Sequence, residues 1–138
     1  MALLVPTEGE LELLDKMLKD ALSTDEDFVL HLFKNNYTPV DGTTSTDFTE
    51  ADFTNYTVRT LTRANWNASV TVSGKAESSY GSSPLSWTCG ATGNTVYGYW
   101  VQGAASSAVC WAERFGTSRV LAEDDVLNLT PKFTLNTE

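Results

Sequence analysis

The stretch of sequence that decides the fold class is TVYGYWVQ (residues 95–102), followed by GAASS (103–107) and AVCWAERF (108–115). The two flanking stretches are rich in aromatic and β-branched residues, which favour strands. The segment between them contains only small residues, as in a β-hairpin with a longer loop. These residues therefore predict an antiparallel hairpin and, with it, a β-rich domain.

The aromatic residues of this hairpin can be interpreted in two ways. Alternation along a strand places Tyr97 and Tyr99 on one face, and Val96 and Trp100 on the other. If these rings are buried, they form cross-strand core pairs with Trp111, and this is the interpretation that we favour. If they are exposed, they form a stacking platform of the kind that binds carbohydrate.

Further strand patterns lie on both sides of the hairpin. In residues 126–135, Leu127, Leu129 and Phe133 alternate with polar residues, and Pro131 indicates an edge strand or a bulge because it cannot donate to a ladder. A series of short strands after one helix predicts a mostly β fold, either an antiparallel β-sandwich or a flattened barrel with one N-terminal α-helix. The other strand patterns cover residues 28–33, 58–62, 67–72, 75–80 and 85–89.

The N-terminal part of the chain has a different pattern. Residues 1–6 form a short apolar arm, and residues 7–23 have the capping spacing and charge pairs of a helix. The leucine stripe of this helix, formed by Leu11, Leu14, Leu18 and Leu22, is expected to pack on the sheet of its own domain. Docking of the stripe on a neighbouring subunit is the alternative. With the β domain at 28–138, the chain of 138 residues is expected to be a single domain.

The charge balance excludes several classes of partner. Acidic residues outnumber basic residues eighteen to nine, for a formal net charge of -9. A protein that binds nucleic acid or an anionic membrane surface needs clustered Lys and Arg, and the basic residues here are scattered. The sequence contains no long apolar run that could span a bilayer and no basic start typical of a secretion signal. We therefore expect the protein to fold in a cytoplasm, without nucleic acid or membrane as a partner.

The residues that most often carry catalysis are scarce. His31 is the only histidine, it lies inside a predicted strand, and no neighbour in the sequence completes a triad with it. Assembly of a triad from distant positions stays an open alternative. Cys89 and Cys110 lack the spacing of a metal site, and a meander of strands would hold them too far apart to bridge. We therefore predict no catalytic residues, no metal and no cofactor, and we expect both cysteines to remain thiols.

Several longer stretches together resemble a family of small proteins encoded by tailed bacteriophages. Members of this family are usually described as virion structural proteins, and it carries no known catalytic residues. In size and class the chain is similar to capsid decoration (cement) proteins, which lock the hexamers of a shell together. The stretches are LVP (4–6) before an acidic helix, LFKNNYTP (32–39), FTEADF (48–53), TVYGYW (95–100), WAERF (111–115) and LTPKF (129–133).

The resemblance implies a non-enzymatic decoration subunit of a virion, assembled in the host cytoplasm. Its partners would be the major capsid protein or other virion proteins, and it would form a homo-oligomer, with a trimer favoured by analogy. The alternative is a tail or baseplate component, such as an adhesin module that binds host glycan, and an unrecognised enzyme comes third. The expected assembly contacts are Leu3, Leu4, Val5, Phe48, Phe53, Tyr56 and Pro131.

Overall fold

The computed structural model describes residues 3–9 and 27–135. Residues 7–9 are helical, at the start of the helix expected over residues 7–23. The rest of that helix, with its leucine stripe, lies outside the described residues.

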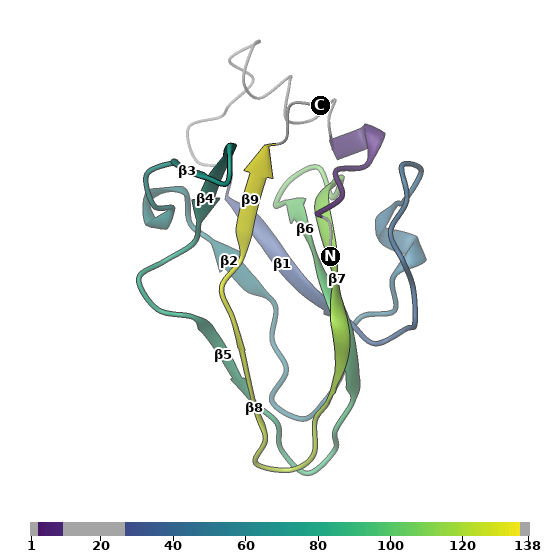
Figure 1. Cartoon of the computed structure of the whole chain (residues 1–138). Helices are drawn as coiled ribbons and strands as arrows, with labels where there is room; N and C mark the ends of the chain where they lie inside the picture. Colours follow the sequence, from purple (N-terminus) through teal and green to yellow (C-terminus); the bar gives the residue numbers. More distant parts are fainter. Residues whose placement is uncertain (1–2, 10–26, 136–138) are drawn as a thin grey trace.

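The described chain is mostly β and antiparallel, as the sequence predicts. Its strands form three sheets, in the orders β2-β1-β6-β7, β3-β4-β9 and β5-β8 (Figure 1). Each of these sheets is open, so the flattened barrel is wrong for the part of the chain that the structure describes. The strands are β1 (Phe28–Phe33), β2 (Arg59–Leu61), β3 (Val70–Val72), β4 (Lys75–Ser79), β5 (Leu85–Thr88), β6 (Thr95–Gly103), β7 (Val109–Val120), β8 (Val126–Leu129) and β9 (Lys132–Leu135), with 3₁₀ turns η1 (Ser45–Asp47) and η2 (Arg63–Asn65).

The predicted hairpin is confirmed as β6 and β7, but its register is interrupted. The pairing shifts between Val96 and Gly98, and again between Val101 and Gln102. A bulge of this kind changes the face on which the following side chains lie. Val96 accordingly packs in the main core, whereas Trp100 lies in a second cluster. The predicted pairing of faces, Tyr97 with Tyr99 and Val96 with Trp100, is therefore wrong.

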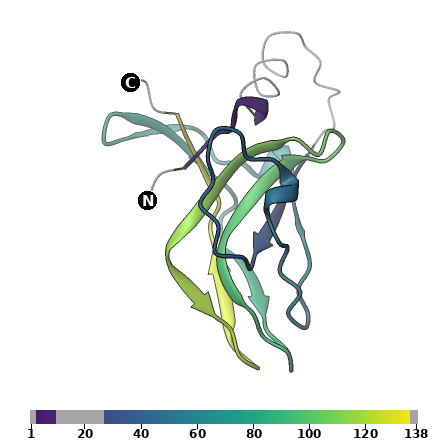
Figure 2. The same ribbon diagram turned by 90° about the vertical axis from the view of Figure 1, so that its right-hand side faces the viewer.

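The four-stranded sheet is covered on both faces. On one face, Leu30, Tyr99 and Trp111 belong to the main core, which also contains side chains of β5, β8 and β9. On the other face, Trp100 and Ala112 are covered by Phe48, from the long connection between β1 and β2. Figure 2 shows this connection, in blue, lying across the strands of the sheet. Burial on both faces explains why β1 is almost continuously apolar.

The last predicted strand is two strands in two different sheets. β8 pairs with β5, whereas β9 pairs with β4. Pro131 lies in the break between them, is buried, and accepts a hydrogen bond from the Tyr80 amide through its carbonyl (2.9 Å). Both strands lie at the edge of their sheets, as expected around a residue that cannot donate to a ladder. Because of this break, residues 126–135 contribute one strand to each of the two smaller sheets.

The two cysteines are buried and do not form a disulfide, as predicted. The reason is different from the predicted one, because β5 pairs with β8 and not with β6, so no meander links β5 to the hairpin. Burial raises the pKa of the Cys89 thiol, and the nearby Asp125 and Glu123 raise it further. A thiol in such surroundings stays protonated and is a poor nucleophile.

Candidate assembly site at the edge of the four-stranded sheet

β7 is the outer strand of the four-stranded sheet, and the N-terminal arm lies along it. The Leu4 amide donates to the Ala112 carbonyl (3.0 Å), and the Ala112 amide donates back to the Leu4 carbonyl (2.9 Å). This reciprocal pair makes an antiparallel bridge. The arm therefore meets the edge of β7 as an added strand would.

The side chains of the arm alternate between the two faces of the sheet. Leu3 and Val5 pack against the main core. Leu4 lies between them in sequence and opposite Ala112, which belongs to the cluster on the other face. All three arm residues are half-buried, whereas Pro6 is buried. The expected contact residues Leu3, Leu4 and Val5 thus already have a binding surface within this chain.

Residues 7–9 continue the attachment of the arm to β7. The Thr7 amide donates to the Asp41 carbonyl (3.1 Å), and a Glu8 carboxylate oxygen accepts the Val109 amide (2.8 Å). A Cβ placed on Gly9 would lie 2.4 Å from the carbonyl oxygens of both Val109 and Cys110. Only glycine fits at this position, because the two backbones touch there.

A groove of about 430 Å³ lies beside the arm. Its walls are mostly apolar, and the two polar residues among them are Thr38 and Arg114. The Arg114 guanidinium donates to the Tyr37 carbonyl (3.0 Å) and lies 5.6 Å from the centre of the Tyr97 ring. The groove is lined by Leu4, Thr38, Pro39, Ala112, Arg114, Phe115 and Gly116.

Three of the other expected contacts lie inside the chain. Phe48 is 8% exposed and stacks parallel on Trp100, with 4.7 Å between the ring centres. Phe53 is 2% exposed and packs edge-on against Tyr56 at 5.3 Å. Pro131 is also buried. The side chains of Phe48, Phe53 and Pro131 are therefore part of this chain's own interior and offer little surface to a partner.

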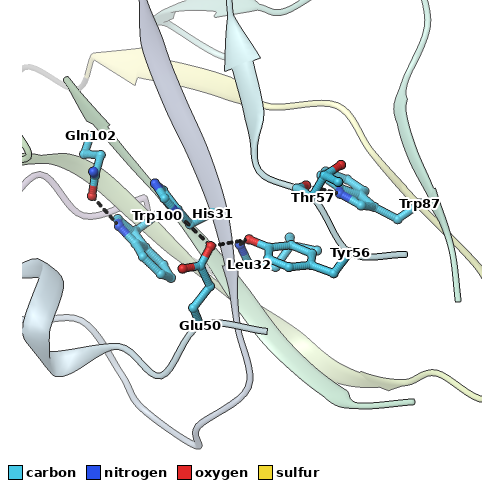
Figure 3. Close-up of polar contacts among 8 residues, drawn as sticks. All are labelled: His31, Leu32, Glu50, Tyr56, Thr57, Trp87, Trp100 and Gln102. Atoms are coloured by element: carbon cyan, nitrogen blue, oxygen red, sulfur yellow. Dashed lines mark hydrogen bonds and ion pairs between the residues drawn. The ribbon is translucent and has the colours of Figure 1, made fainter. Parts of the chain in front are cut away.

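Tyr56, the remaining expected contact, belongs to a polar cluster with His31 and Glu50 (Figure 3). One carboxylate oxygen of Glu50 lies 2.8 Å from His31 Nδ1 and accepts the Tyr56 hydroxyl at 2.9 Å. The His31 ring stacks on Trp100, with 4.6 Å between the ring centres. The connection between β1 and β2 folds back and brings Glu50 to His31, so this histidine is packed within a hydrogen-bonded cluster whose members lie far apart in the sequence.

This cluster closes the edge of β1 beyond the end of β2. β2 pairs with β1 only as far as Leu30. Past that point, the Leu32 amide donates to the Tyr56 hydroxyl (3.1 Å), and the Leu32 carbonyl accepts the Ala51 amide (2.9 Å). Burial raises the pKa of Tyr56, so its hydroxyl stays protonated and donates to Glu50. The connection between β1 and β2 thus satisfies the amide and the carbonyl of Leu32 at the edge of β1 by hydrogen bonds.

Replacing Tyr56 by phenylalanine should lower the free energy of unfolding by about 1–3 kcal/mol, because the Leu32 amide loses its acceptor. Denaturant titration measures the change. The matched control is Tyr97→Phe, a half-buried tyrosine for which we expect less than about 0.5 kcal/mol. Equal losses in the two variants would contradict a stabilising role for the hydrogen bond between the Leu32 amide and the Tyr56 hydroxyl.

Three aromatic residues of the hairpin are buried, and Tyr97 is half-buried. Tyr99, Trp100 and Trp111 are 1%, 4% and 2% exposed. Trp100 also has its indole N–H bonded to the Gln102 side chain (3.0 Å). These three rings fill the two sides of the four-stranded sheet, so they are not a stacking platform at the surface.

Within the ranges 3–9 and 27–135, no group of three or more His, Cys, Asp and Glu side chains is placed to hold a metal ion. No helix of the described chain is long and apolar enough to span a membrane. Comparison with models of protein families, with curated proteins and with solved structures finds no significant match to this chain.

Proposed function

We propose that this chain is a structural protein of a tailed-phage particle and acts without catalysis, as a decoration (cement) subunit of the capsid. The proposal starts from the resemblance of the sequence to small virion proteins. The observation that carries it is the pairing of an apolar N-terminal arm with the edge of β7 through Leu4 and Ala112. Strand addition of this kind is a recurrent way for proteins to hold one another, because main-chain hydrogen bonds supply affinity.

A decoration subunit binds a capsid shell through many copies of the same contact. Each copy makes modest contacts with its neighbours, and the symmetry of the shell multiplies them. The partners in this proposal are the major capsid protein and further copies of the chain, assembled as a trimer in the host cytoplasm. The arm and the groove beside β7 are the contact elements. The three open sheets around one core support a β-sandwich as the scaffold that carries them.

The tail-adhesin alternative has less support. It needs exposed aromatic rings, and the hairpin that suggested it keeps Tyr99, Trp100 and Trp111 in the interior. The adhesin alternative therefore keeps only the half-buried Tyr97 of the four hairpin aromatics on which it was based.

Quantitative mass spectrometry of purified particles from a phage that encodes the chain tests the proposal. We expect a copy number in fixed proportion to the major capsid protein, and density for the chain at symmetric positions over the head by cryo-electron microscopy. A few copies at the tail tip, or none in the particle, would contradict it.

A further inference from the structure

We propose that residues 3–9 are an exchangeable arm, and that in the assembled protein the arm of one copy occupies the β7 edge of a second copy. This inference rests on the proposed assembly function and names the partner of the same site. The occupant is defined by the site itself, since the β7 edge of this chain already holds an arm of identical sequence (Figure 1).

The acceptor side of this contact belongs entirely to the body of the domain. Its backbone partners are the Asp41 carbonyl and the peptide groups of Val109 and Ala112. The close approach of Gly9 to the carbonyls of Val109 and Cys110 selects a glycine at one end of the arm. At the other end, the alternation of Leu3, Leu4 and Val5 matches the two apolar faces of the sheet. The arm of a second copy has all of these features, so it can bind the same β7 edge through the same contacts.

The arm is attached to the four-stranded sheet by fewer backbone hydrogen bonds than the long strands are. The β6–β7 and β1–β6 pairs are long ladders, whereas the arm is held by one bridge to β7 and by the hydrogen bonds of Thr7 and Glu8. Its three apolar side chains are half-buried, and a groove of about 430 Å³ lies beside Leu4. A segment with few backbone bonds and partial burial opens at a small fraction of the cost of global unfolding.

The chain between the arm and β1 is long enough for the exchange. Residues 10–26 join Gly9 to Asp27, and by chain length alone this segment spans roughly 25 Å as a helix and roughly 55–60 Å when extended. A domain of this size has a radius of gyration of only about 14 Å. Exchange of an identical element between copies keeps every contact of the arm and adds the link between subunits, so it is a low-cost route to an oligomer.

Disulfide trapping between two differently tagged chains tests the exchange. One chain carries Leu4→Cys and the other Ala112→Cys, since paired residues on antiparallel strands have Cα atoms about 5.5 Å apart, within the range for a disulfide. The chains are mixed, allowed to assemble and oxidised mildly. We expect a covalent product with the mass of one chain of each kind, at roughly ten-fold or more above the control because of the effective concentration within the assembly.

The control replaces Ala112→Cys by Val40→Cys, which is 56% exposed and is not part of the groove. If Ala112→Cys prevents folding, the next pair in the same register, Leu3→Cys with Glu113→Cys, gives the same readout. A single chain carrying both cysteines of a pair completes the test. Covalent multimers support exchange, whereas a cross-link confined to one chain in an oligomeric sample overturns it and leaves the proposed function standing.

The proposed function fails in a distinguishable way. Sedimentation of the native chain reports the oligomeric state independently of any cysteine. A chain that stays monomeric in sedimentation, with its arm cross-linked only to itself and no copies in the particle, overturns both proposals.

Discussion

Replacing Phe48 by alanine is expected to lower the free energy of unfolding by about 3–5 kcal/mol, the range for removing a large buried aromatic side chain. The Phe48 ring stacks on Trp100 and contacts Phe33 and Tyr37, with ring-centre distances of 4.7, 4.9 and 5.5 Å. Its loss would leave a cavity in the second cluster, formed by Phe33, Phe48, Trp100, Val109 and Ala112, and would detach the connection between β1 and β2 from the sheet. Urea denaturation followed by tryptophan fluorescence measures both effects, because Trp100 loses one of its two stacking partners.

This substitution also tests whether Phe48 acts in the core of the chain or as an assembly contact. Val40→Ala, at an exposed position of the same connection, is the control and should cost less than about 0.5 kcal/mol. If Phe48 served assembly and not the core, its variant would keep the stability of the native chain and lose only its ability to form oligomers. That result would contradict the packing of Phe48 in the second cluster.

Replacing Gly98 by alanine is expected to cost at least about 3 kcal/mol, at the upper end of the range for overpacking. A Cβ at this position would lie 2.2 Å from the Glu113 carbonyl oxygen and 2.6 Å from Cζ of Phe33. The first of these atoms belongs to the backbone of β7 and cannot move without breaking its ladder with β6. Thermal unfolding of the purified variant gives the measurement.

Gly116→Ala is the matched control for Gly98→Ala. Both glycines lie in the β6–β7 hairpin, but a Cβ on Gly116 would meet no atom within 4 Å. We expect Gly116→Ala to change the free energy of unfolding by less than about 0.5 kcal/mol. A Gly98 variant as stable as the Gly116 variant would show that β6 and β7 are not as close at this point as the structure has them.

The strands were predictable because their signals are local. β-Branched and aromatic runs between turn residues predicted residues 28–33 for β1 and located the hairpin of β6 and β7. The division of residues 126–135 into β8 and β9 was not predictable in the same way. An alternating pattern with one proline fits a single edge strand as well as it fits two strands in two sheets. Only the pairing partners, β5 and β4, decide between these arrangements.

The candidate site was predicted in part. The apolar arm was recognised from Leu3, Leu4 and Val5, but its binding partner on β7 has no sequence signature, because a main-chain bridge to Ala112 does not depend on the side chain. Gly9 was the one available signal. A glycine inside a helical pattern lowers the stability of the helix, so its presence there often has a packing reason such as a close approach of two backbones. The partnership of His31 with Glu50 had no signal, because the two residues lie far apart along the chain.

The sequence by itself determined that this chain is mostly β, antiparallel and acidic, because strand propensity, turn chemistry and net charge depend on residues near one another or on simple sums. Tertiary structure alone decided which faces the aromatics occupy, since the shift between Val96 and Gly98 reverses the alternation that follows it. It also decided that Phe48 and Phe53 belong to the interior, while the arm lies on the edge of β7. Burial of an aromatic or leucine side chain is favourable against any apolar surface, because the hydrophobic effect is not directional. The surface against which such a side chain packs therefore follows from the path of the whole chain and not from the residue type.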